Sequence, residues 1–243
     1  MRKFEVSFPY FLEYPIKIVV KKLGILGFFG WVFQRFGKKL LRKGNIVITE
    51  RIIEIPTVYL FLSSFCDKGD NILEIGHVNS SLSLELASLG YKVMAVDIRD
   101  YPFEHRNLTS IKADFLKYEF DKKFKCVISV STIEHLGYNK RYGGDQEGRE
   151  GLDELALEKI KTLLDSGGKF ILTVPYAANI RQGVWFRVYT KRTIEEMLGR
   201  YFTAESKNYF IRKNNQWFGA PQDASEDPEY PYDGVAMFLL SKK

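Results

Sequence analysis

The spacing of hydrophobic residues across 70–98 predicts a strand, a helix and a second strand in succession. The apolar run Asn71–Ile75 is typical of a buried strand, and Gly76 directly after it predicts a tight turn. Leucines then recur at helical spacing through 82–89, and a second apolar run covers Lys92–Val96. This order predicts a βαβ unit.

A carboxylate, Asp97, stands at the end of the second predicted strand and follows Gly76 by 21 residues. In βαβ units that bind nucleotides, an acid at this place accepts hydrogen bonds from ribose hydroxyls. The layout therefore predicts a cofactor that carries adenosine. The alternative for a strand-end acid is a simple turn-forming role.

The pattern beyond this unit predicts an α/β fold. Further strands are expected over Thr109–Ala113, Lys125–Val130, Lys169–Val174, Glu205–Arg212 and Val235–Ser241, and further helices over Thr49–Phe65 (with Pro56 inside), over Leu152–Leu164, and from a capping box at Thr193 to Gly199. Alternating strands and helices that end in a strand pair predict a doubly wound, Rossmann-like sheet of seven strands. We expect it to be mostly parallel, with a terminal antiparallel strand pair.

Charge divides the chain into two predicted domains, a basic N-terminal arm over 1–44 and a globular domain over 45–243. The arm holds ten Lys or Arg and two Glu, a net charge of +8, whereas the whole chain carries +6, which leaves −2 for the rest. We expect an amphipathic helical arm. Its apolar run Leu23–Phe33 is too short to cross a bilayer as a helix but suits an anionic membrane surface. The alternatives are a lid or dimer contact, or a re-entrant hairpin.

The nearly neutral charge of 45–243 gives no basic face for nucleic acid, so no nucleic-acid partner is predicted. Cys66 and Cys126 lack the spacing of a metal site and are expected to be reduced, buried thiols of a cytosolic protein. The N-terminus shows no cleavable secretion signal. We expect a cytoplasmic protein, with the arm as a candidate for peripheral attachment to the inner face of the membrane.

Several short motifs occur in the order found in one large enzyme family. They are Glu74-Ile-Gly76, Asp97, Asp114, Ser131-Thr-Ile-Glu-His135 and the turn Leu164-Asp-Ser-Gly-Gly168 before a strand. Together they resemble the class I S-adenosylmethionine-dependent methyltransferases over about residues 45–243. The run SVSTIEHLG resembles an uncharacterised bacterial and archaeal subgroup with an S-T-I-E-H motif after strand four.

The resemblance implies that S-adenosyl-L-methionine is the cofactor and that it lies at the carboxyl ends of the strands. Gly76 would let the backbone approach its methionine part, Asp97 would accept both ribose hydroxyls, and Asp114 would accept from the adenine amino group. The cofactor-binding residues implied in all are Glu74, Gly76, His77, Asp97, Ile98, Asp114, Phe115, Ser131 and Thr132.

The glycine loop departs from the family pattern, which repeats glycine at every second position after the acid. Val78 and Ser80 stand at the second and third glycine positions. A valine lacks easy access to positive φ. Either the loop takes a different path, or the cofactor binds weakly or not at all. Ser80 is a candidate cap for the following helix.

His135, with Glu134 beside it, is the candidate general base for a substrate hydroxyl; the alternative is a packing or capping histidine. Substrate contacts are expected from Arg141, Tyr142, Arg187 and Tyr189, with Trp185 and Trp217 as candidates for the acceptor pocket or the core. No metal is predicted. The acidic residues Asp145, Glu147, Glu150, Asp153 and Glu154 match no calcium loop and are expected to form a solvated loop.

The resemblance implies methyl transfer from S-adenosylmethionine to a small-molecule or glycan acceptor, and the presence of His135 points to oxygen as the methylated atom. Such a transfer is an in-line displacement that needs alignment, exclusion of water and a base. One alternative is a catalytically silent cofactor-binding or scaffold protein. A nicotinamide-dependent dehydrogenase is a third, against which the missing G-x-G-x-x-G argues.

Overall fold

The computed structural model describes residues 49–138, 151–182, 186–223, 225–230 and 233–243. The chain divides into two units, residues 1–47 and 48–243, and only the second is described below. The predicted arm over 1–44 therefore lies outside the described residues. Its helical character and its membrane contact stay predictions.

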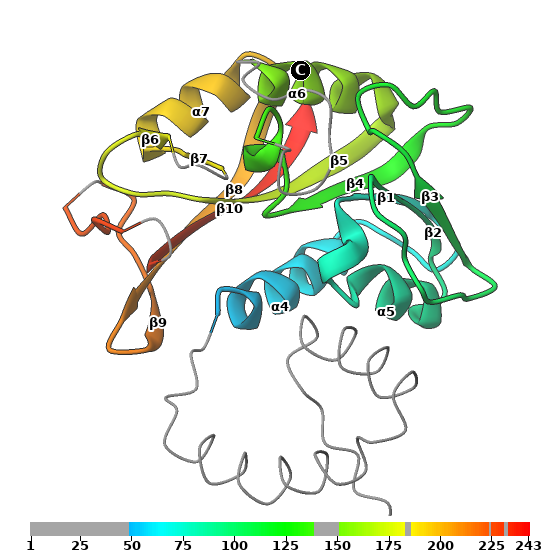
Figure 1. Cartoon of the computed structure of the whole chain (residues 1–243), viewed down its shortest axis with the longest axis horizontal. Coiled ribbons are helices and arrows are strands. Elements are labelled where there is room, and N and C mark those ends of the chain that lie inside the picture. The colour runs from blue at the N-terminus through cyan, green and yellow to red at the C-terminus, as the bar shows by residue number, and fades with distance from the viewer. Residues whose placement is uncertain (1–48, 139–150, 183–185, 224, 231–232) are drawn as a thin grey trace, which may run out of the picture. The chain divides into compact units, whose positions relative to one another are not determined.

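The second unit is built on one eight-stranded sheet in the order β3-β2-β1-β4-β5-β10-β8-β9 (Figure 1). The strands are β1 Asn71–Ile75, β2 Lys92–Asp97, β3 Leu108–Lys112, β4 Phe124–Val130, β5 Leu164–Pro175, β8 Phe202–Lys213, β9 Gln216–Gly219 and β10 Gly234–Lys242. Strands β1 to β5 are parallel, and β10 runs antiparallel to both β5 and β8. The predicted doubly wound, mostly parallel sheet with a terminal antiparallel pair is confirmed.

The count of seven strands was wrong, because the loop after β8 turns back as an additional edge strand, β9. Asn214 and Asn215 connect the two strands, and both have positive φ, 52° and 60°. Two such residues form the tight turn whose twist suits a hairpin, and asparagine tolerates this conformation well. A separate two-stranded sheet pairs β6 (Arg181–Gln182) with β7 (Arg187–Val188).

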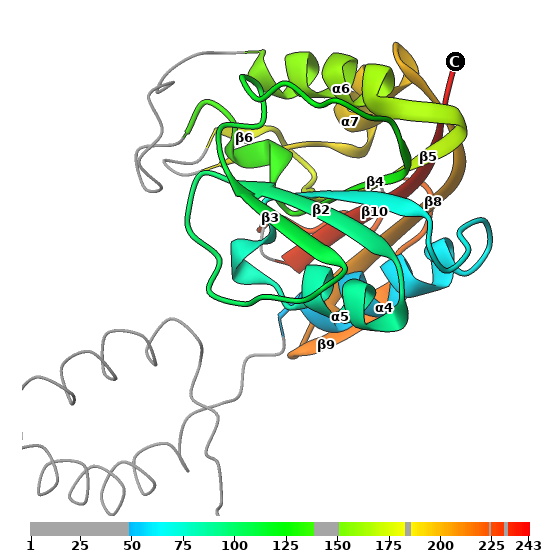
Figure 2. The same cartoon turned by 90° about the vertical axis from the view of Figure 1, so that its right-hand side faces the viewer.

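Helices cover both faces of the main sheet, as Figures 1 and 2 show. Helices α4 (Arg51–Leu62) and α5 (Leu82–Leu89) lie on one face, and α6 (Leu152–Leu163) and α7 (Lys191–Gly199) lie on the other. Short 3₁₀ turns, η2 (His77–Asn79) and η3 (Ile133–His135), follow β1 and β4. Among the described residues, no helix combines the length and the apolar character that a bilayer crossing requires.

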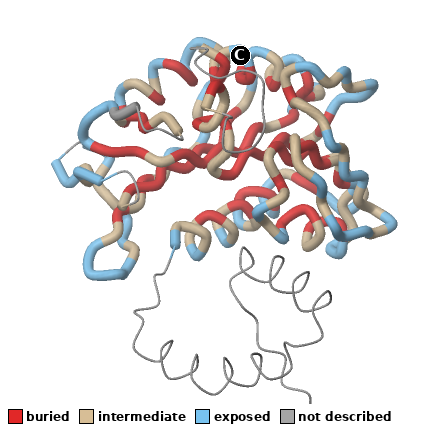
Figure 3. The backbone as a smooth tube through the Cα atoms, in the orientation of Figure 1, coloured by how far each residue is buried: buried red, intermediate tan, exposed pale blue. Residues whose placement is uncertain are grey.

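Each face of the sheet has its own hydrophobic core, and alternate residues of one strand enter different cores. In β1, Leu73 and Ile75 belong to the core under α6 and α7, whereas Ile72 belongs to the core under α4 and α5. The central strands are therefore buried on both sides (Figure 3). This packing holds the loops at the strand ends on a rigid support.

Two predicted boundaries were wrong for local reasons. The capping box of α7 begins at Thr190, whose side chain accepts from the Thr193 backbone, so the helix starts before the predicted box. The predicted turn Asp165–Gly168 lies within β5, at a shift in its pairing with β4. Gly168 is required there, because a Cβ atom would lie 2.8 Å from the carbonyl oxygen of Phe124.

Candidate functional site

A cavity of about 260 Å³ opens at the carboxyl ends of the parallel strands. Its walls come from the ends of β1, β2, β4 and β5, from the loop after β3, and from more distant segments. The lining residues are Glu50, Arg51, Ile75, Gly76, Asn79, Val96, Asp97, Ile98, Arg99, Ala113, Asp114, Phe115, Ser131, Thr132, Glu134, His135, Leu136, Pro175, Phe186, Trp217, Gly234 and Val235. Open parallel sheets hold ligands at this edge.

The structure brings together nine of the predicted site residues in this cavity. They are Gly76, Asp97, Ile98, Asp114, Phe115, Ser131, Thr132, Glu134 and His135. Glu74, His77, Arg187 and Tyr189 are outside its lining, and Arg141 and Tyr142 lie outside the described residues. Whether any of these residues binds a cofactor or substrate stays a prediction.

Gly76 has a left-handed backbone, with φ of 80°, where the chain leaves β1. A Cβ atom at this position would lie 2.3 Å from two side-chain atoms of Thr132, which follows β4. The glycine is therefore required twice, once for its φ and once for the close approach of the neighbouring strand end. Both requirements concern the protein alone and would exist without a ligand.

The loop after Gly76 follows a path that needs no glycine at position 78. Val78 lies in the 3₁₀ turn η2, and no positive φ occurs there. Its backbone N–H donates to Asp97 Oδ2 over 3.2 Å. The N-cap position of α5 is Ser81 and not the predicted Ser80. The hydroxyl oxygen of Ser80 nevertheless accepts from the Leu82 backbone N–H, at the first residue of the helix, over 3.0 Å. The loop thus takes a path that valine can adopt.

The carboxylate of Asp97 is almost fully buried and accepts four N–H groups. Arg99 provides three of them, from Nε and its backbone to Oδ1 (2.9 and 3.0 Å) and from Nη2 to Oδ2 (2.9 Å). The backbone of Val78 provides the fourth. Asp97 therefore joins the end of β2 to the loop after β1.

Asp114 and Phe115 form the wall of the cavity beyond β3. Oδ1 of Asp114 accepts from the Leu116 backbone N–H over 2.9 Å, which is the turn-forming role expected of a strand-end acid. Oδ2 lies 3.8 Å from Lys117 Nζ. Phe115 is buried in the core under α6 and α7, so it contributes an apolar surface of fixed position.

Ser131 is strained, because it is a non-glycine residue with φ of 43°. Its backbone N–H donates to the Thr173 backbone oxygen over 3.1 Å and to the Thr173 hydroxyl over 2.9 Å. Its own hydroxyl donates to Glu54 over 2.6 Å. These contacts hold the strained turn at the end of β4 in place, beside Thr132.

Glu54 of α4 is a buried acid that contacts the cavity residue Ser131, and it was not predicted from the sequence. It also accepts from the Thr173 hydroxyl over 2.5 Å and from Arg51 Nη1 over 2.9 Å. Burial is the main cause that raises its pKa. The position of Glu54 could have indicated this role, because Glu54 shares the buried face of α4 with Val58, Phe61 and Leu62. A lone acid on an apolar helix face indicates a polar partner inside the protein.

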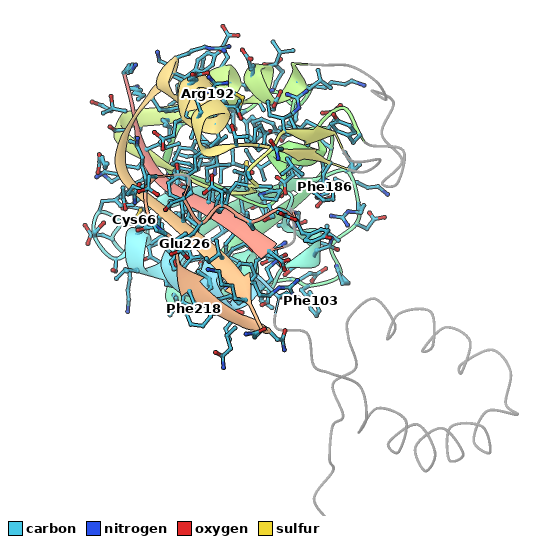
Figure 4. The ribbon with its side chains drawn as sticks, turned by 90° about the vertical axis from the view of Figure 1, so that its left-hand side faces the viewer. Cys66, Phe103, Phe186, Arg192, Phe218 and Glu226 are labelled. Carbon is cyan, nitrogen blue, oxygen red and sulfur yellow. The ribbon has the colours of Figure 1, made fainter. Side chains whose placement is uncertain are left out.

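Glu134 and His135 lie side by side in η3, with Glu134 Oε1 3.9 Å from His135 Nε2. Glu134 is 2% exposed, and burial raises the pKa of its carboxyl well above the usual range. The protonated form is thereby favoured, and a protonated carboxyl cannot accept a proton. His135 is more exposed, and its ring packs edge-on against Phe186, with centroids 5.7 Å apart. Phe186 is labelled in Figure 4.

Two predicted cofactor residues support the loop from behind. Glu74 is buried in β1 and accepts from the Ser83 hydroxyl of α5, and His77 is buried with Nε2 2.8 Å from the Ser110 hydroxyl oxygen. Burial lowers the pKa of His77, which favours the neutral ring. Glu74 thus joins β1 to α5, and His77 joins η2 to β3; neither residue lines the cavity.

Burial raises the pKa of Glu74 from 4.5 to about 7. At pH values between these two pKa values, the Glu74 carboxyl is therefore protonated in the folded protein and ionised in the unfolded chain. The stabilisation of the folded protein by protonated Glu74 is complete below about pH 4.5, and it is lost as the pH rises to about 7. We expect the free energy of unfolding to fall by roughly 2–3 kcal/mol for this group between about pH 5 and about pH 8.

A Glu74→Gln variant lacks this titration and retains an oxygen for Ser83. Urea unfolding at both pH values is expected to show a smaller fall for Glu74→Gln than for the wild type. Glu104→Gln, at an exposed position, is the control that leaves the fall unchanged. Equal falls in all three proteins would contradict the assignment.

Arg187 and Tyr189 bind an acid of α6 instead of facing the cavity. Asp153 Oδ2 accepts from Arg187 Nη1 over 2.6 Å and from the Tyr189 hydroxyl over 2.9 Å. Asp153 is buried, so the expectation of a solvated acidic position was wrong for this residue. The remaining acids of that stretch, except Glu154, lie outside the described residues, as does Trp185.

Trp217 and Phe186 line the cavity from segments that the sequence does not connect with it. Trp217 belongs to β9, the edge strand that was not predicted, and Phe186 precedes β7. Arg212 of β8 lies over the Trp217 ring, 5.8 Å from its centroid. Trp217 was a candidate for the acceptor pocket or the core, and the structure places it in the cavity lining. Phe186 was not predicted, because sequence periodicity gives no signal for a contact between distant chain segments.

No family model matches the sequence, and a comparison with curated proteins also finds no match. Solved structures do share the fold. The 1,6-didemethyltoxoflavin-N1-methyltransferase of Burkholderia thailandensis, with bound 1,6-didemethyltoxoflavin and S-adenosylhomocysteine, is 12% identical over 100% of this chain and 93% of its own, with a TM-score of 0.58. The N-methyltransferase NodS of Bradyrhizobium japonicum, in complex with S-adenosylhomocysteine, is 15% identical over 82% of this chain and 89% of its own, with a TM-score of 0.54.

A third structure, the PH0226 protein of Pyrococcus horikoshii, is 18% identical over 82% of this chain and 94% of its own, with a TM-score of 0.52. At these identities the likeness shows the fold, an α/β Rossmann-like sheet that is mostly parallel and ends in antiparallel strands. Two of the three proteins are methyltransferases by name. The subgroup suggested by the S-T-I-E-H motif stays a prediction.

Proposed function

We propose that this protein transfers a methyl group from S-adenosylmethionine to a small-molecule or glycan acceptor. The observation that carries the proposal is the convergence of Gly76, Asp97 and Asp114 on one cavity from three different strand ends. The family resemblance assigns these three residues to the cofactor. The fold shared with two methyltransferases supports the same reaction class.

The cavity residues fit such a cofactor. Carboxylates at Asp97 and Asp114 would accept from ribose hydroxyls and an adenine amino group, and Ile98 and Phe115 add apolar surface to the lining. Ser131 and Thr132 would line the sulfonium pocket beside Gly76. S-adenosylmethionine supplies an electrophilic methyl group when it is bound. The protein supplies alignment and exclusion of water.

We further propose oxygen as the methylated atom and His135 as the general base. A hydroxyl nucleophile must lose a proton, and imidazole titrates near neutral pH. His135 lies in the cavity lining, whereas buried Glu134 favours its protonated form. Glu134 therefore serves better as a neighbour that positions His135 than as the base. Phe186 and Trp217 are candidates for apolar contacts with the acceptor.

Arg141 and Tyr142 remain proposed substrate contacts on the sequence alone. For Arg187 and Tyr189 we propose an indirect role in substrate binding, because both side chains bind Asp153. Cytoplasmic location, and contact of residues 1–44 with an anionic membrane, are likewise proposals from composition and charge.

The test of this function is formation of S-adenosylhomocysteine when the protein is incubated with S-adenosylmethionine and a panel of hydroxylated small molecules and glycans. With an accepted substrate, we expect His135→Ala to lower kcat by about 10²–10⁴-fold, the usual contribution of a general base. Affinity for S-adenosylmethionine is expected to change little.

His105→Ala is the matched control, because His105 accepts from the Asn107 backbone and is outside the cavity lining. It is expected to keep full activity. A His135→Ala protein with unchanged kcat would contradict the role of His135 as base. Methylation of an amine, when no hydroxyl compound is methylated, would contradict oxygen as the acceptor atom.

One observation favours a second candidate, a protein without catalytic activity. Arg99 already fills acceptor positions of Asp97 that ribose hydroxyls would need. If this contact were permanent, nucleoside binding at Asp97 would be blocked. Binding of S-adenosylmethionine, measured directly, separates the two candidates.

A further inference from the structure

Arg99 forms a two-pronged contact with Asp97 at the cofactor end of the cavity. Nε donates to Oδ1 and Nη2 donates to Oδ2, each over 2.9 Å. The third guanidinium nitrogen, Nη1, donates to Asn79 Oδ1 over 3.1 Å. Asn79 lies in η2, so one arginine side chain connects the end of β2 with the loop after β1. All three residues line the cavity.

Counting acceptor positions shows why this contact matters for a ribose. An ionised carboxylate offers about four lone-pair positions. In Asp97, two receive the backbone N–H groups of Val78 and Arg99, and two receive the Arg99 side chain. Two ribose hydroxyls therefore have to replace the guanidinium to bind both oxygens.

We propose that Arg99 sets the affinity for the cofactor by competing with the ribose hydroxyls for Asp97. The inference rests on the proposed function, in which Asp97 receives the ribose. Before ribose binds, Arg99 holds the carboxylate and fixes the loop through Asn79. When ribose binds, the side chain releases Asp97 while the two backbone donors stay.

The surroundings permit this exchange. The Arg99 side chain is 29% exposed, so water can solvate its charge after release. Asp97 keeps the Val78 and Arg99 backbone donors and gains the ribose hydroxyls, so no buried lone pair loses a partner. Only a fraction of the molecules has Asp97 open at any moment, and the apparent dissociation constant rises by the inverse of that fraction.

Calorimetric titration with S-adenosylhomocysteine tests the proposal on the full chain. An Arg99→Ala variant is expected to bind about fivefold more tightly than the wild type, the gain that corresponds to a partly exposed ion pair. Arg99→Lys retains the charge but loses the two-pronged geometry, and we expect an intermediate affinity. Arg106→Ala removes the same charge at an exposed position of the β2–β3 loop and is expected to bind like the wild type.

A ligand without ribose hydroxyls sharpens the test. The 2′,3′-dideoxy form of S-adenosylhomocysteine does not compete with the guanidinium, so Arg99→Ala is expected to give no gain for it. An NMR signal from Arg99 Nε–H reports the contact directly. We expect it to shift when S-adenosylhomocysteine is added to the wild type and to stay in place with the dideoxy form.

The outcomes separate this inference from the proposed function. Tighter binding by Arg99→Ala than by the wild type, seen with the ribose ligand alone, supports the inference. Equal or weaker binding by a folded Arg99→Ala protein, with normal binding by the wild type, overturns the competition and leaves the function intact. No binding by any variant, with circular dichroism showing folded proteins, overturns both.

Discussion

Asp97→Ala is expected to weaken binding of S-adenosylmethionine by about 100-fold or more. A hydrogen bond to a charged acceptor contributes about 1.5–3 kcal/mol, and the variant removes the proposed acceptor for two ribose hydroxyls. The release of Arg99 in the same variant offsets only a small part of this loss. Asp97→Asn retains one carbonyl oxygen for Val78, so we expect a smaller loss of affinity and better stability.

Asp100→Ala is the matched control for this prediction. Asp100 lies three residues further along, its side chain is 79% exposed, and it binds Lys112 over 2.6 Å. Calorimetric titration of the three variants and the wild type is expected to show loss only at Asp97. Unchanged affinity in a folded Asp97→Ala protein would place the ribose elsewhere.

Gly76→Ala is expected to lower the free energy of unfolding by roughly 3 kcal/mol and to abolish cofactor binding. The left-handed backbone costs an L-residue about 1–2 kcal/mol, and forcing atoms into a packed site costs about 1–3 kcal/mol. The new Cβ would meet Thr132 at 2.3 Å, so either the loop or Thr132 has to move. Both line the cavity, which couples the stability loss to the binding loss.

The variant Gly167→Ala separates the cost of the left-handed backbone from the cost of the contact with Thr132. Gly167 has φ of 78°, close to that of Gly76, but a Cβ atom there meets nothing within 4 Å. Urea unfolding is expected to show a smaller loss for Gly167→Ala, from the backbone term alone, with binding retained. If both variants lose the same stability, the contact with Thr132 contributes nothing.

The parts of the fold that follow from short stretches of sequence were predicted well. The β1–α5–β2 unit rests on a change of apolar spacing within residues 71–97, and its strand β1 begins and ends where the pattern predicts. Asp97 and Gly76 lie at its strand ends, so their places in the cavity follow from the topology of a parallel sheet. Local patterns thus predicted the part of the cavity that Gly76 and Asp97 form.

The rest of the cavity lining depends partly on contacts between distant segments. His135 and Trp217 were candidates from the sequence, whereas Phe186 was not. Glu54 meets Ser131 across 77 positions of sequence, and Trp217 reaches the cavity only because Asn214 and Asn215 turn the chain back into β9. Arg99 was missed for a different reason. It lies two residues after Asp97, but sequence alone does not show whether a side chain points to solvent or folds back onto its neighbour.

The most direct test of the cofactor site is calorimetric titration of the wild-type protein with S-adenosylmethionine. The convergence of Gly76, Asp97 and Asp114 on one cavity predicts a single site with a dissociation constant in the micromolar range. A folded protein that takes up no S-adenosylmethionine, at concentrations far above that range, would contradict the assignment of this cavity to a methyltransferase.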